Sequence, residues 1–220
     1  MGDQRGQIRR GASREMSLRY RVFRSAMILL GRLLYGFNVQ GAEEVPEKGP
    51  LIIASNHHQY ADPVLICMAV PRRMQWMAKR ELFVPPFDRF FYFIGSFPVD
   101  RQKGGRAGLR AALDFLSQGW VLGIFPEGGR RKQTDPEGHD SPKSGVVMLA
   151  ARASAPILPV FVGRAPNPLE RLRGKKLHIR IGNPITMDNT KGGREAREEV
   201  AGEVLREIYT LGQKAGGAVP

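Results

Sequence analysis

The chain has 220 residues, the length of a single domain that can bury a hydrophobic core. Lys and Arg number 34 against 21 Asp and Glu, so the formal net charge is +13, and 42% of the residues are hydrophobic. With a mean hydropathy of -0.30, this composition excludes both an integral membrane bundle and a disordered chain. The single cysteine, Cys67, excludes intrachain disulfides and cysteine-rich zinc modules. No apolar run reaches the ~20 residues of a membrane-spanning helix and the first residues do not read as a signal peptide, so we expect a cytoplasmic protein.

The first 40 residues hold almost half of the positive excess, with eight arginines and two acidic residues. From Met16 to Phe37 the apolar side chains recur with the period of a helix. The opposite face of this helix is basic and carries Arg14, Arg21, Arg24 and Arg32. Such a helix can lie in the interface of an anionic membrane, or it can pack on the core with its arginines in solvent. We expect residues 1–40 to form a basic membrane-association segment and residues 41–220 to form the main domain.

Downstream of Gly41, short apolar runs alternate with helical segments. Strands are predicted at residues 51–55, 74–78, 96–99, 120–125, 156–162 and 176–182. Helices are predicted near residues 104–117, 144–154 and 193–213, and one more begins at Asp62-Pro63 with Asp62 as its N-cap. This alternation predicts an α/β fold, in which helices flank a mixed, largely parallel sheet and the amphipathic N-terminal helix lies on the membrane surface.

Polar residues cluster where three of the predicted strands lie or end. The clusters are residues 56–62 after the first strand, 95–101 at the third and 125–130 after the fourth. Ligands of open α/β folds bind at the carboxyl ends of the strands. The motifs of serine hydrolases, Walker nucleotide sites, dinucleotide sites and zinc proteases are absent from the sequence. The candidate chemistry therefore rests on these three clusters.

His57 and Asp62 are the first candidate pair. They are five residues apart, so their side chains can meet only if a turn or a helix start lies between them. An aspartate bonded to one ring nitrogen fixes the histidine's tautomer and leaves the other nitrogen to act as a base. Taken alone, the two residues fit a helix-capping aspartate beside a loop histidine at least as well.

Four motifs taken together decide between these interpretations. They are His57-x4-Asp62 preceded by Asn56, Gly95 to Arg101, Phe125-Pro126-Glu127-Gly128 followed by Arg130, and Ile157 to Val160. In order and spacing the chain resembles the glycerophospholipid acyltransferases over about residues 40–185, most closely the 1-acylglycerol-3-phosphate (lysophosphatidate) branch. The resemblance implies an acyltransferase domain at 41–220 that moves a fatty acyl group from acyl-CoA or acyl carrier protein to a lipid hydroxyl. It implies that His57 is the general base, that Asp62 holds it and that no covalent acyl-enzyme forms.

The resemblance also implies an anion site for the phosphate of the acceptor. The expected substrate-binding residues are Arg101, Glu127, Gly128, Arg130 and Lys143. The chain departs from the family pattern at Gly129 and Arg131, where Thr and Ser are usual, and at Gln59, where Ser is frequent. These departures leave the proposed base intact and the identity of the acceptor open.

We therefore expect a lysophosphatidate acyltransferase of phospholipid biosynthesis at the cytoplasmic face of the cell membrane. Its expected partners are an anionic membrane surface, the acyl-CoA or acyl carrier protein thioester and a lysophospholipid, with no nucleic acid, no metal and no further cofactor. The alternative is an acyltransferase for glycerol 3-phosphate or another lysolipid. A basic nucleic-acid-binding protein is a distant alternative that rests on the +13 charge alone.

Overall fold

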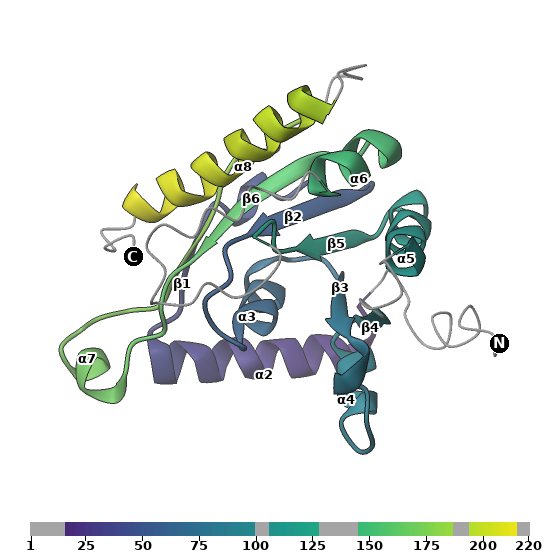
Figure 1. Ribbon diagram of the computed structural model, residues 1–220. Coiled ribbons are helices and arrows are strands. Elements are labelled where there is room, and N and C mark those ends of the chain that lie inside the picture. Colours follow the sequence, from purple (N-terminus) through teal and green to yellow (C-terminus); the bar gives the residue numbers. More distant parts are fainter. Residues whose placement is uncertain (1–15, 100–105, 128–144, 187–193, 215–220) are drawn as a thin grey trace.

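The computed structural model describes residues 16–99, 106–127, 145–186 and 194–214 (Figure 1). Its strands are β1 (Asn38–Gln40), β2 (Leu51–Ser55), β3 (Met74–Lys79), β4 (Ser96–Val99), β5 (Val121–Ile124), β6 (Ile157–Val162) and β7 (His178–Ile181). They form one sheet in the order β1-β7-β6-β2-β5-β3-β4, in which the described pairs are parallel apart from β6 with β7. The six predicted strands are present, and the predicted α/β fold with a mixed, largely parallel sheet is confirmed.

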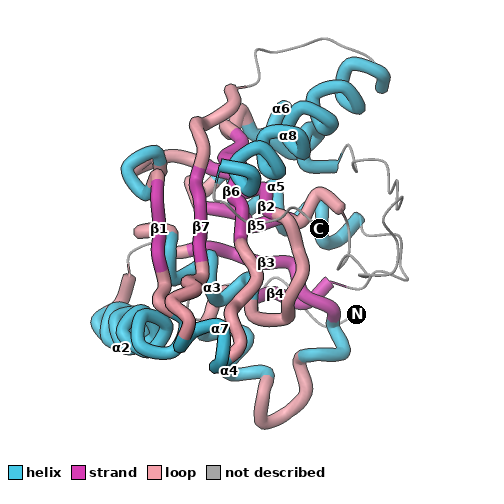
Figure 2. The backbone as a smooth tube through the Cα atoms, turned by 90° about the vertical axis from the view of Figure 1, so that its left-hand side faces the viewer, coloured by secondary structure: helices cyan, strands magenta, loops and turns pink. Residues whose placement is uncertain are grey.

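Helices cover both faces of this sheet (Figures 1 and 2). The helices are α2 (Leu18–Tyr35), α3 (Asp62–Ala69), α4 (Asp88–Phe93), α5 (Arg106–Ser117), α6 (Gly145–Ala153), α7 (Pro168–Leu172) and α8 (Arg194–Lys214), with 3-10 turns η1 (Ala42–Glu44) and η2 (Arg80–Leu82). Helices α2 and α3 lie on one face, and α5, α6 and α8 lie on the other. Strand β2 is buried throughout because Ile53 packs toward the first layer and Ile52 toward the second.

The sheet topology brings three strand ends to one edge. Strand β2 pairs in parallel with β5 on one side and with β6 on the other. Their carboxyl ends therefore lie side by side, and they lead into residues 56–57, 125–127 and 162–163. Two of the polar clusters found in the sequence meet at this edge.

Helix α2 packs on the domain through one stripe of side chains. Tyr20 and Gly31 are buried, while Phe23 and Met27 are partly buried. A Cβ at Gly31 would lie 2.7 Å from the Cε atom of Met68 in α3, so a side chain here would displace the end of the Met68 side chain. The structure has a helix, Leu18–Tyr35, in the segment where one is predicted. In the described part of the chain, no helix combines the length and the apolar character needed to cross a bilayer.

The prediction that Arg24 belongs to an outward basic face is wrong. Its guanidinium is partly buried and donates hydrogen bonds to the carbonyl oxygens of Cys67, Met68 and Val70, at 3.1, 2.7 and 3.2 Å. These carbonyls end α3, where a helix leaves its acceptors unpaired and its dipole favours a cation. Burial lowers the pKa of Arg24 from its usual value. Arg24 thus joins α2 to α3.

Replacing Arg24 by alanine is expected to destabilise the fold by about 1–3 kcal/mol, because the carbonyls at the end of α3 lose their donors. The free energy of unfolding measured in urea tests this. Arg21→Ala is the matched control, since Arg21 is exposed on the same helix, and its effect should stay within about 0.5 kcal/mol. Equal losses from both variants would contradict the bracing role of Arg24.

Candidate active site

His57 and Asp62 meet at the carboxyl end of β2. The Nδ1 atom of His57 lies 3.0 Å from Oδ2 of Asp62, and when it carries its hydrogen it donates to that oxygen. The carboxylate is buried, whereas 16% of the histidine side chain is exposed. The buried carboxylate thus fixes one ring nitrogen and leaves Nε2 available as a proton acceptor. The pairing of these two side chains, predicted from the sequence, is present.

The loop between these two residues folds around the carboxylate. The backbone N–H groups of His58 and Gln59 each donate to Oδ2 of Asp62 at 2.8 Å. The N-cap of α3 is Ala61 and Asp62 is the first helical residue, so the predicted N-cap role of Asp62 is wrong. Its Oδ2 atom is instead engaged by three donors of the preceding loop. Asp62 therefore holds both the His57 ring and the backbone of the two residues that follow it.

Asn56 anchors the residue before the histidine. Its side chain is buried and makes two hydrogen bonds with the backbone of Val162: Nδ2–H donates to the carbonyl oxygen and Oδ1 accepts from the N–H, both at 2.8 Å. Gln59 reaches the same segment, donating to the carbonyl oxygen of Gly163 at 3.4 Å. The loop that carries His57 is thus tied to the end of β6 as well as to α3.

Two aromatic side chains complete the surroundings of His57. The Phe125 ring, which follows β5, stacks on the imidazole with centroids 3.9 Å apart, and the ring of Trp76 in β3 stacks against Phe125 with centroids 5.1 Å apart. From the sequence, Phe125 was identified as part of a motif, but no contact was predicted for it. Trp76 was not identified as a site residue, because its contact with Phe125 depends on the pairing of β3 with β5, which the sequence does not show.

Glu127 lies near the same edge and has a partner that the sequence does not reveal. Its Oε1 atom accepts a hydrogen bond from the hydroxyl of Tyr209 in α8. Its Oε2 atom is buried and has no hydrogen-bond partner among the described residues. In the sequence, Tyr209 is one more residue of an amphipathic helix, so no local signal could have found it. The other expected substrate-binding residues, Arg101, Gly128, Arg130 and Lys143, lie outside the described residues.

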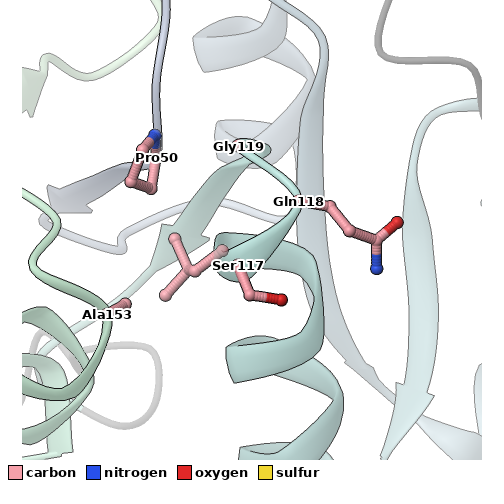
Figure 3. Close-up of a pocket in the computed structure, with 6 residues that line it drawn as sticks. Pro50, Ser117, Gln118, Gly119 and Ala153 are labelled. Carbon is pink, nitrogen blue, oxygen red and sulfur yellow. The ribbon is translucent and has the colours of Figure 1, made fainter.

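A hollow near the opposite edge of the sheet is shown in Figure 3. It is lined by Pro50, Leu116, Ser117, Gln118, Gly119 and Ala153. Pro50 precedes β2 and Gly119 lies just before β5, so the hollow is at the amino ends of these strands, away from His57. None of the six lining residues has an ionisable side chain, and the hollow offers no group for acid–base chemistry. Within the described residues, no cluster of three or more His, Cys, Asp or Glu could hold a metal ion.

The fold and the site define an α/β protein with a candidate general base at the carboxyl edge of its sheet. A family model described as Acyltransferase matches residues 36–163, more than half of the sequence, and the chain belongs to this family. The match spans the His57–Asp62 pair and the segment 125–127.

Individual relatives agree with this family. The chain is 28% identical over 168 residues to a 1-acyl-sn-glycerol-3-phosphate acyltransferase of Bacillus subtilis, covering 76% of this chain and 82% of that protein. It is 30% identical over 132 residues to the enzyme of the same name from Borreliella burgdorferi, covering 59% of this chain and 52% of that one. The crystal structure of the 1-acyl-sn-glycerophosphate acyltransferase PlsC from Thermotoga maritima has the same fold, with a TM-score of 0.65, 22% identity and coverage of 94% and 86%.

Proposed function

We propose that the protein transfers a fatty acyl group from a thioester to the free hydroxyl of 1-acylglycerol 3-phosphate, giving phosphatidate. The observation that carries this proposal is the hydrogen-bonded pair of His57 and Asp62 at the carboxyl edge of the sheet. The substrate comes from the names of the relatives in Bacillus subtilis and Borreliella burgdorferi. The donor is acyl-CoA or acyl carrier protein, and the reaction needs no metal and no other cofactor.

In the proposed reaction, Nε2 of His57 removes the proton of the acceptor hydroxyl as its oxygen attacks the thioester carbonyl. A C–O bond forms and the C–S bond breaks, so the sulfur leaves as a thiolate. The thiolate then takes the proton from the His57 imidazolium and becomes the free thiol. Asp62 keeps the ring oriented and stabilises the imidazolium between the two proton transfers. A thiol with a reference pKa of ~8.5 is a good leaving group, so a second acid is not required.

The acyl group passes directly to the acceptor in this proposal, without a covalent enzyme intermediate. The single cysteine of the chain, Cys67, is buried, and its thiol accepts a hydrogen bond from the indole nitrogen of Trp76 at 3.2 Å. Burial raises the pKa of Cys67 to about 11, although the hydrogen bond from Trp76 and the nearby arginines lower it. A protonated, inaccessible thiol is a poor nucleophile, which supports direct transfer.

The phosphate of the acceptor requires cations close to the base. We assign this role to Arg101 and Arg130, with Lys143 as a further contact, because guanidinium groups match phosphate oxygens. Glu127, held by Tyr209, orients one of these arginines or the free hydroxyl of the acceptor.

An anionic membrane at the cytoplasmic face of the cell is the proposed location, because the outward face of α2 is apolar. The exposed large side chains on this face are Leu18, Val22, Leu29, Leu30, Leu33 and Leu34. Arg19, Arg21 and Arg32 are also exposed on α2, so the helix offers cations to anionic headgroups. Phe23 and Met27 of the same helix are partly buried.

Two neighbouring segments extend the apolar surface of α2. Phe93 of α4 contacts Tyr20 and Phe23 at one end of α2, and Arg171 of α7 lies close to Gly36 at the other. Around α4 and on α7, further large apolar side chains are exposed: Leu82, Val84, Phe87, Phe90, Leu169 and Leu172. Figures 1 and 2 show α2, α4 and α7 along the same side of the molecule. Apart from Tyr60 in the site loop, the exposed large hydrophobic residues of the described chain all belong to α2, to α7 or to the segment of η2 and α4.

A panel of acceptors tests the proposed substrate. Purified protein is incubated with acyl-CoA, and thiol release is followed with lysophosphatidate, glycerol 3-phosphate, other lysophospholipids and a lysolipid without phosphate. We expect release with lysophosphatidate and phosphatidate as the product by mass spectrometry. Turnover of only another acceptor supports the alternative acyltransferase, and salt-sensitive nucleic-acid binding without any acyl transfer supports the distant one.

A further inference from the structure

Three aromatic rings form a stack that ends on the candidate base. The imidazole of His57 and the ring of Phe125 are 3.9 Å apart with an interplanar angle of 12°, and the rings of Phe125 and Trp76 are 5.1 Å apart at 24°. The residues come from three neighbouring strands, because His57 follows β2, Phe125 follows β5 and Trp76 lies in β3. The stack therefore runs from Trp76 within β3, past Phe125 after β5, to His57 after β2, where the chemistry is proposed.

The far end of the stack is held firmly. Trp76 is buried, and its indole N–H donates to the Sγ atom of Cys67 at 3.2 Å. Its register partner in β5 is Gly123, where an added Cβ would lie 2.5 Å from the indole ring. The absence of a side chain at Gly123 thus makes room for the indole. A fixed indole gives Phe125 a fixed surface to lie on.

A hydrogen bond through one nitrogen does not fix the orientation of the His57 ring plane. The contact with Asp62 sets the position of Nδ1, but the plane of the ring can still tilt, and Nε2 moves with it. A ring face packed against the imidazole at 3.9 Å prevents that tilt. The same face carries the negative side of the aromatic quadrupole, which attracts the imidazolium formed when His57 takes a proton.

We infer that Phe125, supported by Trp76, is a positioning residue for the proposed base: it sets the plane of the His57 ring and stabilises its cationic form during acyl transfer. This inference rests on the proposed function of His57. It assigns to Phe125 a role in turnover and none in substrate binding. A loss of the ring should therefore lower kcat and leave KM nearly unchanged.

Phe125→Leu and Phe125→Tyr test the inference, because leucine removes the flat ring and tyrosine keeps it. We expect kcat to fall about tenfold in Phe125→Leu, KM for lysophosphatidate to stay within about twofold, and Phe125→Tyr to recover most of kcat. Phe115→Leu is the matched control. Phe115 is a buried core residue that packs on Phe97 and Trp120, on the opposite face of the sheet from the stack, so this variant should keep kcat.

The chemical shifts of the His57 ring protons in a proton NMR spectrum test the stacking directly, and a change in protein stability alone would not alter them. In the unmodified protein the His57 ring protons, assigned by their absence from His57→Asn, should lie upfield because of the ring current of Phe125. That measurement stands even where Phe125→Leu does not fold. Wild-type kcat in folded Phe125→Leu, an equal loss in Phe115→Leu, or unshifted His57 protons would overturn the inference. Absence of acyl transfer by the unmodified enzyme would instead overturn the proposed function.

Discussion

Replacement of His57 by alanine is expected to lower kcat for acyl transfer by a factor of about 10²–10⁴, the usual contribution of a positioned general base. The fold should persist, because 16% of the side chain is exposed and its hydrogen bond goes to Asp62 alone among the described residues. Thiol release from acyl-CoA with lysophosphatidate measures the rate, and circular dichroism with thermal unfolding measures the fold.

The neighbouring histidine provides a matched control. His58 contributes its backbone N–H to the Asp62 carboxylate, and His58→Ala keeps that donor while removing an imidazole one residue away. We expect His58→Ala to retain most of the activity. Asp62→Asn keeps the shape of the side chain and removes its charge, so its kcat should fall between those of the unmodified protein and His57→Ala. Full activity in folded His57→Ala would rule out the proposed base.

Strands and helices were predictable from the sequence where the apolar pattern is long enough to show whether a segment is a strand or a helix. The continuous apolar run of β2 predicts a strand buried on both faces, and the periodic segment that becomes α8 predicts a long helix. Strand β1 has the sequence Asn-Val-Gln and carries no such pattern. It is a strand because β7 offers its backbone a parallel partner. Helices α4 and α7, of six and five residues, are too short to show a period.

In the candidate site, too, contacts between residues close in the sequence were predictable, and contacts between distant segments were not. His57 and Asp62 are close in sequence, and the helix start at Asp62 allows their side chains to meet. The spacing alone left the pairing open, and the four motifs taken together predicted it. The contacts of Phe125 with Trp76 and of Glu127 with Tyr209 join segments far apart in the chain. They depend on strand order and on the placement of α8, neither of which a local pattern contains. Arg24 shows the same limit, because only the position of α3 decides that this arginine is partly buried against the domain.

Replacing Leu29 and Leu33 by glutamate is expected to abolish binding of the protein to anionic vesicles. Both side chains are more than half exposed, at 60% and 68%, and they lie on the outward face of α2. Burying each leucine in the membrane interface contributes about 1.5–3 kcal/mol, so the double variant should bind at least about 100-fold more weakly. Flotation with vesicles of phosphatidylglycerol and phosphatidylcholine measures the bound fraction. Activity on lysophosphatidate presented in vesicles should fall with it, while activity on a short-chain soluble analogue should remain.

The control for this variant has to match its charge. Arg110→Gln with Arg152→Gln also lowers the net charge by two, at exposed positions on α5 and α6 away from α2, and it should retain vesicle binding. Deletion of residues 1–40 is a poorer test, because it removes the buried Tyr20 and strand β1 together with the apolar face. If Leu29→Glu with Leu33→Glu floats as well as the unmodified protein, α2 is not the membrane contact. An equal loss in both double variants would show that net charge alone drives binding, with no part played by the apolar face.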